Sequence, residues 1–171
     1  MKSYTRFSCT LFFRKLRIGI PLFILLNGLV LQETKAHGLD QSVIPADVLC
    51  VLDGDTVKVK AHVWIGQTIE THVRLHDIDT PELKSKDADE RKAAIKAKEK
   101  VLTLLGIEKE KNICDNTTKA RVYLNDIQKD KYGGRVVATI KTENGTDIAS
   151  ILLQENLAYA YRGKTKQPFR K

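Results

Sequence analysis

The chain is poor in cysteine and has no apolar run long enough for an ordinary membrane-spanning helix. Its 171 residues include three cysteines, too few for a disulfide scaffold or a four-thiolate zinc site. With 29% charged and 42% hydrophobic residues, the composition excludes an intrinsically disordered chain and a multi-span membrane protein. Internal repeats and low-complexity segments are absent as well. The length therefore suits a single domain with a substantial core.

The longest apolar run covers residues 18–31, which is short of the roughly 20 residues that a spanning helix needs. A basic segment without acidic residues precedes this run, and the small residues Thr34 and Ala36 follow it. This order is typical of a secretory signal peptide. We therefore predict a signal peptide over residues 1–36, cleaved after Ala36, with export to the periplasm or the medium and no stable membrane association. An uncleaved membrane anchor is the alternative.

Removal of that segment changes what the net charge implies. The whole chain has a formal charge of +8, but six basic residues and one acidic residue lie within residues 1–36. The remaining 23 basic and 20 acidic residues leave a net charge of about +3, too little to argue for nucleic-acid binding by charge alone. The mature chain is divided into a short lead over residues 37–45, a domain over residues 46–161 and a basic tail over residues 162–171.

The thiol and imidazole groups give weak signals. Cys50 is expected on a strand and Cys114 in a polar loop, and in an oxidising compartment they could pair. The sequence leaves open whether they form a disulfide. His62, His72 and His76 do not predict a zinc site, because His72 and His76 are separated by roughly 13 Å along one strand. We interpret these histidines as solvent-facing strand residues.

Alternation of apolar and polar residues predicts short β-strands. Such runs occupy residues 46–52, 57–63, 69–75, 122–127 and 136–140. Two amphipathic helices are predicted, one capped by Asp87 and ended by Gly106, the other capped by Asp147 and ended by Asn156. The order β-β-β-α-β-β-α favours a mainly β fold, a five-stranded OB-fold barrel with two flanking α-helices. Trp64, near the end of a predicted hairpin, is expected to anchor the core or a sheet edge.

Acidic and basic residues form one pattern along the predicted domain. Asp53-Gly54-Asp55-Thr56 follows the first strand, Arg74 lies on the third, Asp79-Thr80-Pro81-Glu82 comes after it, and Arg135 precedes the fifth. Taken singly, each piece has an ordinary structural interpretation, such as a hairpin turn for the first and a solvated side chain for Arg74. Together the pieces suit the hydrolysis of a phosphodiester.

Each residue type in this pattern has a role in such a reaction. A hard divalent cation prefers oxygen ligands, which Asp55 and Asp79 supply. Glu82, a few residues further on, is a candidate base for the attacking water. Arg74 and Arg135 present planar guanidinium groups that match the phosphoryl oxygens of the transition state, which lysine would match less well.

These motifs resemble the signature of the staphylococcal nuclease (thermonuclease) family. The resemblance runs in order over nearly all of residues 46–161, and its R-x4-D-T-P-E spacing is specific. It implies an OB-fold barrel with flanking helices, and Ca²⁺-dependent cleavage of DNA and RNA that leaves 3′-phosphate ends. Residue by residue, the resemblance implies metal ligation by Asp55, Asp79 and the Thr80 carbonyl with Asp53 as support, Glu82 as general base or water organiser, and Arg74 and Arg135 as phosphate binders.

The sequence departs from the family pattern before its last arginine. The family's Tyr-Gly-Arg is here Tyr132-Gly133-Gly134-Arg135, which adds one residue. In a strand, an added residue forms a bulge or slips the register, and a slip reverses the face that a side chain occupies. We expect a bulge at Gly134 and a catalytic Arg135. Tyr132 and Tyr161 are candidates for stacking on a base, with an ordinary barrel tyrosine as the alternative for each.

The sequence thus predicts an exported, monomeric, Ca²⁺-dependent nuclease that acts on DNA and RNA with little sequence specificity. The alternative is a catalytically inactive OB-fold barrel that binds nucleic acid or protein without cleaving it. Arg74, Asp55, Asp79 and Glu82 are all present. A degenerate copy is expected to have lost some of these residues, so the pattern favours the enzyme.

Overall fold

The structure, a computed structural model, describes residues 43–131 and 133–161. The predicted signal peptide, most of the lead segment, Tyr132 and the basic tail lie outside the described residues. Within the described ranges, no helix combines the length and the apolar character that crossing a membrane requires.

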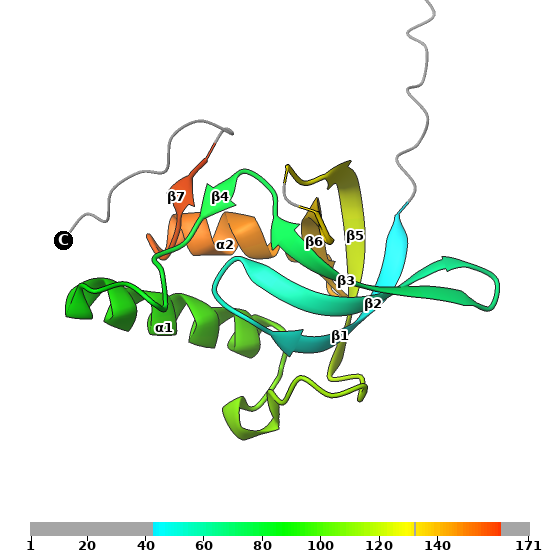
Figure 1. Cartoon of the computed structure of the whole chain (residues 1–171), viewed down its shortest axis with the longest axis horizontal. Helices are drawn as coiled ribbons and strands as arrows, with labels where there is room; N and C mark the ends of the chain where they lie inside the picture. Colours follow the sequence, from blue (N-terminus) through cyan, green and yellow to red (C-terminus); the bar gives the residue numbers. More distant parts are fainter. Residues whose placement is uncertain (1–42, 132, 162–171) are drawn as a thin grey trace, which may run out of the picture. The chain divides into compact units, whose positions relative to one another are not determined.

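Five strands close into a barrel in the order β1-β2-β3-β6-β5 (Figure 1). They are β1 (Ile44–Val51), β2 (Thr56–Trp64), β3 (Gln67–Leu75), β5 (Ala120–Lys129) and β6 (Arg135–Thr142). Neighbouring strands are antiparallel except β3 and β6, which run parallel. This is the five-stranded OB-fold barrel that the sequence predicts. A further antiparallel pair, β4 (Ile78–Asp79) with β7 (Tyr159–Ala160), has no counterpart in the prediction.

Apolar residues at alternate strand positions fill the barrel. On β2, Val57 and Val59 are at most 1% exposed, while Lys58 between them is half-buried. Beyond the packed part, the β2–β3 hairpin extends away from the barrel (Figure 1), and Trp64 near its tip is 76% exposed. The expectation that Trp64 anchors the core or an edge is therefore wrong, because the strand continues past the region where the barrel packs.

Helix α1 (Ala88–Leu104) begins and ends at the predicted signals. Asp87 is its N-cap, and the Asp87 side chain accepts a hydrogen bond from the backbone N–H of Asp89. Gly106 follows the helix with φ at 66°, a left-handed conformation that glycine adopts without strain. Ala94, Ala97, Val101 and Leu102 form the buried face.

Helix α2 (Ile148–Gln154) is also bounded as predicted. The Asp147 carboxylate accepts from two backbone N–H groups of the first turn. Asn156 ends the helix with φ at 56°. The helix packs against β6, and α1 packs against α2 and β1, so both helices cover the barrel wall (Figure 1).

A disulfide fastens the segment between α1 and β5 to the barrel. It joins Cys50 on β1 to Cys114, with the two Cα atoms 5.0 Å apart. The segment contains the short 3-10 helix η1 (Lys109–Lys111). Just after it, the Asn112 side chain accepts from the Val51 backbone N–H at 2.8 Å and donates to the Val51 carbonyl at 3.0 Å. The pairing of the two cysteines, which the sequence leaves open, is therefore present in the structure.

Candidate active site

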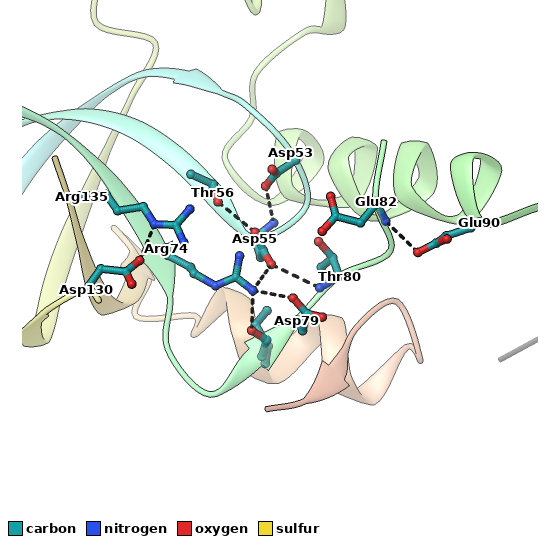
Figure 2. Close-up of polar contacts among 11 residues, drawn as sticks. Asp53, Asp55, Thr56, Arg74, Asp79, Thr80, Glu82, Glu90, Asp130 and Arg135 are labelled. Atoms are coloured by element: carbon teal, nitrogen blue, oxygen red, sulfur yellow. Dashed lines mark hydrogen bonds and ion pairs between the residues drawn. The ribbon is translucent and has the colours of Figure 1, made fainter. Parts of the chain in front are cut away.

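The acidic residues of the sequence pattern meet at one end of the barrel, where the β1–β2 turn approaches β4 (Figure 2). Asp55 and Asp79 are 3% and 6% exposed. The Asp53 carboxylate accepts from the backbone N–H of Asp55 at 3.1 Å. Thr56 Oγ1 donates to Asp55 Oδ1 at 2.9 Å, and the backbone N–H of Thr80 donates to Asp55 Oδ2 at 3.3 Å. These contacts fix both the turn and the Asp55 carboxylate.

Arg74 on β3 joins the two buried carboxylates. Its Nη2 lies 2.8 Å from Oδ2 of Asp55 and 2.5 Å from Oδ1 of Asp79. Burial by itself would lower the pKa of Arg74, but the charges of Asp55 and Asp79 outweigh this effect and raise the pKa above its ordinary value. The arginine is therefore cationic. It ties β3 to both acidic segments instead of being a solvated side chain.

Burial and a neighbouring negative charge disfavour the ionised form of Asp55. Burial raises the pKa of Asp55 to about 6, and the negative charge of Asp53 adds to this rise while Arg74 opposes it. The ionised carboxylate is thus disfavoured even with Arg74 beside it. Additional positive charge next to Asp55 would favour the ionised form.

Glu82 follows the acidic cluster, on the segment between β4 and α1. It is exposed and lines a cleft. Its backbone N–H donates to Glu90 Oε1 at 3.3 Å, and Ser85 Oγ donates to Glu90 Oε2 at 2.5 Å, so Glu90 braces the segment that carries Glu82. In Figure 2 the Glu82 side chain is drawn beside Thr80, on the side of the buried acidic cluster.

Strand β6 begins at Arg135. The side chains of Arg135 and Arg74 lie on the same face of the sheet. Val137 is the partner of Arg74 in the β3–β6 ladder, and residues two apart on a strand point to the same face. Gly134 lies in the β5–β6 turn with φ at 84°. The added glycine is therefore accommodated in the turn, and not by a bulge at Gly134 in the strand as expected. Nε of Arg135 donates to the carboxylate of Asp130, which is 7% exposed.

A cleft of about 380 Å³ opens beside these residues, a volume in the range of small-molecule sites. Its lining includes Arg74, Asp79 and Glu82 from the predicted set. Tyr161 also lines it, and the Tyr161 backbone N–H donates to the carbonyl of Asp77 at 2.7 Å. The structure thus brings Arg74, Asp79, Glu82 and Tyr161 of the predicted set to one cleft, while Asp53, Asp55, Thr80 and Arg135 are not part of its lining.

Further polar residues of this cleft were not among the predicted site residues. His76 is placed among solvent-facing residues by its strand pattern, but it lies in the cleft wall with Gln128 and Asp130. His76 Nδ1 is 3.1 Å from Asp77 Oδ2, and its Nε2 is 3.3 Å from the side-chain nitrogen of Gln128. The two-residue spacing from Arg74 could have indicated His76. No comparable signal marks Gln128.

The donors at the acidic end fit a hard cation. Among the residues that the structure describes, no group of three or more His, Cys, Asp or Glu side chains is arranged to hold a metal. The carboxylates of Asp55 and Asp79 do converge on one nitrogen, however, and Thr80 is buried next to Asp55. Hard divalent cations bind carboxylates, backbone carbonyls and waters together. A cation here would therefore need backbone and water oxygens in addition to the two side chains.

Comparison with known proteins gives a family assignment. A family model described as staphylococcal nuclease homologue matches residues 72–171, which is more than half of the chain. The matched range includes Arg74, residues 79–82 and Arg135, while the turn at residues 53–56 lies before it. No individual curated protein matches the chain. With its OB-fold barrel and the extent of this match, the chain belongs to the staphylococcal nuclease homologue family.

Proposed function

We propose that the protein is an exported, Ca²⁺-dependent nuclease that hydrolyses phosphodiester bonds of DNA and RNA with little sequence specificity. The observation that carries this proposal is the junction of Arg74 with the buried Asp55 and Asp79, at the edge of a cleft that Glu82 also lines. Membership of the family supports a nuclease-like activity on nucleic acids.

The two arginines bind the scissile phosphate from one sheet face. Guanidinium groups contact phosphate oxygens through two parallel N–H donors. Negative charge grows on these oxygens as the water attacks, and donors that are already fixed stabilise it without reorganising. Arg74 is fixed by Asp55 and Asp79, and Arg135 by the largely buried Asp130. The oxygen of the attacking water bonds to phosphorus as the bond from phosphorus to the 5′ oxygen breaks. This leaves a 3′-phosphate and a 5′ oxygen that takes up a proton to become a hydroxyl.

The acidic end holds the cation and supplies the base. Asp55, Asp79 and the Thr80 carbonyl are the proposed Ca²⁺ ligands, while Asp53 holds the turn through the backbone of Asp55. When bound, Ca²⁺ would supply positive charge that offsets the negative charge developing in the reaction. Glu82 accepts the proton of that water, a role that its exposed position on the cleft wall permits.

Export is supported by the disulfide between Cys50 and Cys114, because such bonds persist in oxidising compartments. N-terminal sequencing of the protein recovered from the periplasm or the medium tests this part of the proposal. A chain that starts at His37 supports cleavage after Ala36. A chain that starts at Met1 and is recovered with membranes supports the uncleaved anchor.

Digestion of single- and double-stranded DNA and of RNA tests the activity. Residues 37–171 are assayed with Ca²⁺ and with a chelator, beside the Glu82→Gln variant. Glu143→Gln is the matched control, because Glu143 is an exposed glutamate beyond the end of β6. Cleavage that requires Ca²⁺, fails in Glu82→Gln and persists in Glu143→Gln supports the proposal. Tight binding without cleavage would instead indicate a binding module, and the absence of both would refute the proposed function.

A further inference from the structure

Two aspartates near the cleft, Asp77 and Asp126, have a left-handed backbone conformation. Asp77, after β3, has φ at 59°, and Asp126, within β5, has φ at 52°. Aspartate adopts this left-handed conformation more readily than most residues, and at a turn or a bulge it changes where the next side chains point. Neither residue ends a helix, which is the ordinary explanation for Asn156. At each of these two aspartates, the left-handed backbone positions a neighbouring side chain.

The irregular backbone at Asp126 changes the direction in which the Gln128 side chain points. Pairing between β5 and β6 shifts between Asn125 and Gln128, so one extra residue of β5 is accommodated there as a bulge. After the bulge, Gln128 is the partner of Val137, and Val137 is in turn the partner of Arg74. Partners in a ladder share a face, so Gln128 stands in one row with Arg74 across three strands. All three residues of this row line the cleft.

The turn at Asp77 positions His76 beside that row. His76 is two residues beyond Arg74 and continues the pairing of β3, since its backbone N–H donates to the carbonyl of Ala138 at 3.0 Å. His76 and Arg74 therefore face the same cleft, separated by about 7 Å along the chain. The Asp77 side chain, 66% exposed, lies against the His76 ring.

The side chains of Asp77, His76 and Gln128 form a continuous row of polar contacts. Oδ2 of the Asp77 carboxylate lies 3.1 Å from Nδ1 of His76, and its negative charge favours the neutral form of the ring that carries the proton on Nδ1. The Nε2 of His76 is then an acceptor, and it receives an N–H from the Gln128 side-chain amide, whose nitrogen is 3.3 Å away. A glutamine amide on an exposed strand is ordinarily free to flip its oxygen and nitrogen. Here the histidine specifies which end is nitrogen.

A glutamine amide that is held in this way keeps one N–H and one carbonyl oxygen for a ligand. This donor–acceptor pair matches the N6 amino group and N7 of adenine, the base that Gln and Asn contact with two hydrogen bonds. We propose that Gln128, oriented by Asp77 and His76, is a base-discriminating residue that favours adenine in the nucleotide bound beside the phosphate at Arg74. This inference rests on the proposed nuclease function and adds a specificity determinant to it.

A digest of a random-sequence single-stranded DNA pool, read by sequencing all ends, tests the inference. The wild-type protein is expected to enrich adenine at one position flanking the cut by about fivefold or more. Gln128→Leu should reduce this enrichment below about twofold, and His76→Phe should reduce it as well because the amide loses its anchor. Base frequencies are ratios within one digest, so they do not depend on the overall rate of each variant. Gln67→Leu, which changes an exposed glutamine at the start of β3, is the control and should keep the wild-type profile.

Binding of adenosine and cytidine 3′,5′-bisphosphates, measured by calorimetry, separates the two hypotheses. Tighter binding of the adenosine compound that is lost in Gln128→Leu supports the inference even if no cleavage occurs. Cleavage with flat base frequencies, or with an adenine preference that Gln128→Leu leaves intact, overturns the inference and leaves the nuclease standing. The absence of both cleavage and nucleotide binding overturns both.

Discussion

Nη2 of Arg74 lies 2.5 Å from Oδ1 of Asp79, a charge-assisted contact between β3 and β4. The same nitrogen lies 2.8 Å from Asp55, so one guanidinium balances both proposed metal ligands. A bound cation would supply the positive charge that the two carboxylates now obtain from Arg74. A bound phosphate would supply the negative charge that Arg74 now obtains from the carboxylates. We therefore expect cation binding and phosphate binding to reinforce each other at this site.

Arg74→Lys should abolish most of the activity while the protein stays folded. Lysine keeps the positive charge but lacks the planar group that contacts two carboxylates and a phosphate at once. Loss of one such transition-state donor lowers kcat by roughly 100- to 1,000-fold. The measurement is the rate of DNA cleavage at saturating Ca²⁺, with circular dichroism to verify folding.

Arg121→Lys is the matched control for this substitution. Arg121 also forms an ion pair with a largely buried aspartate, since its Nη2 lies 2.7 Å from Asp47, but this pair joins β5 to β1 instead of facing the cleft. The Arg121→Lys variant should retain activity near that of the wild type. Equal losses in both variants would mean that the effect of Arg74→Lys is structural.

Asp55→Asn should stabilise the metal-free protein above about pH 6. Because burial raises the pKa of Asp55 from 3.8 to about 6, folding favours the protonated carboxyl. The stability associated with this proton is present below pH 3.8 and is lost as the pH rises through about 6. Asparagine resembles the protonated form, so at pH 7 the gain is of the order of 2–3 kcal/mol. Urea unfolding in chelator at pH 4 and pH 8 measures it.

Asp47→Asn should destabilise the protein at pH 8 in the same experiment, which is the opposite of the effect expected for Asp55→Asn. Burial alone would raise the pKa of Asp47, but hydrogen bonds from Arg121 and His62 outweigh it and hold the pKa below 3.8. The stabilising contribution of Asp47 is therefore present above pH 3.8 and is lost as the pH falls below the lowered value. If Asp55→Asn and Asp47→Asn lose similar amounts of stability at pH 8, the opposite pKa shifts of Asp55 and Asp47 are contradicted.

Reduction of the disulfide between Cys50 and Cys114 should destabilise the protein. The bond closes a chain segment with a sequence separation of 64 residues, which limits the freedom of the unfolded chain. A loss of about 2–4 kcal/mol is expected. The shift of the urea midpoint on adding a thiol reductant measures it. The double variant Cys50→Ala, Cys114→Ala should show the lower midpoint with and without reductant, and a reductant effect in that variant would rule out the disulfide as the cause.

Much of the fold could be predicted because its signals are local. The alternation on β2 and the caps at Asp87 and Asp147 depend on neighbouring residues only, and the structure confirms each of them. The β4–β7 pair could not be predicted, since two-residue strands show no alternation. Trp64 was misplaced because an apolar residue indicates burial, whereas the length by which a hairpin exceeds its barrel is a property of the whole sheet.

The candidate site was predicted where its members fall in motifs. Asp55, Asp79 and Arg74 meet as the pattern suggests. The contact between Arg135 and Asp130 and the row that includes Gln128 were not predicted. They depend on a turn and on a bulge that decide which side chains of β5 and β6 face the cleft. Sequence spacing does not determine such register changes.

The packing role of Gly54, in the Asp53-Gly54-Asp55 turn, could not be predicted from the sequence either. Read as a sequence, Gly54 indicates a tight turn. In the structure, a Cβ at this position would lie 2.8 Å from the Cβ of Ala97 on α1 and 3.0 Å from the side chain of Thr80. Gly54 is thus needed because the turn that carries Asp55 packs directly against the helix and the Thr80 segment.

Gly54→Ala should therefore lower both stability and activity. The added methyl group pushes the turn away from Ala97, which costs about 1–3 kcal/mol as overpacking does elsewhere, and it displaces Asp55 from Arg74 and Asp79. Gly133→Ala is the control, because a Cβ there meets nothing within 4 Å. Adding Ala97→Gly to Gly54→Ala removes the closest contact and should recover part of the lost activity, despite the roughly 1 kcal/mol that glycine costs a helix. Cleavage rates and urea midpoints of these variants measure both effects, and wild-type activity in Gly54→Ala would show that the turn can shift without moving Asp55.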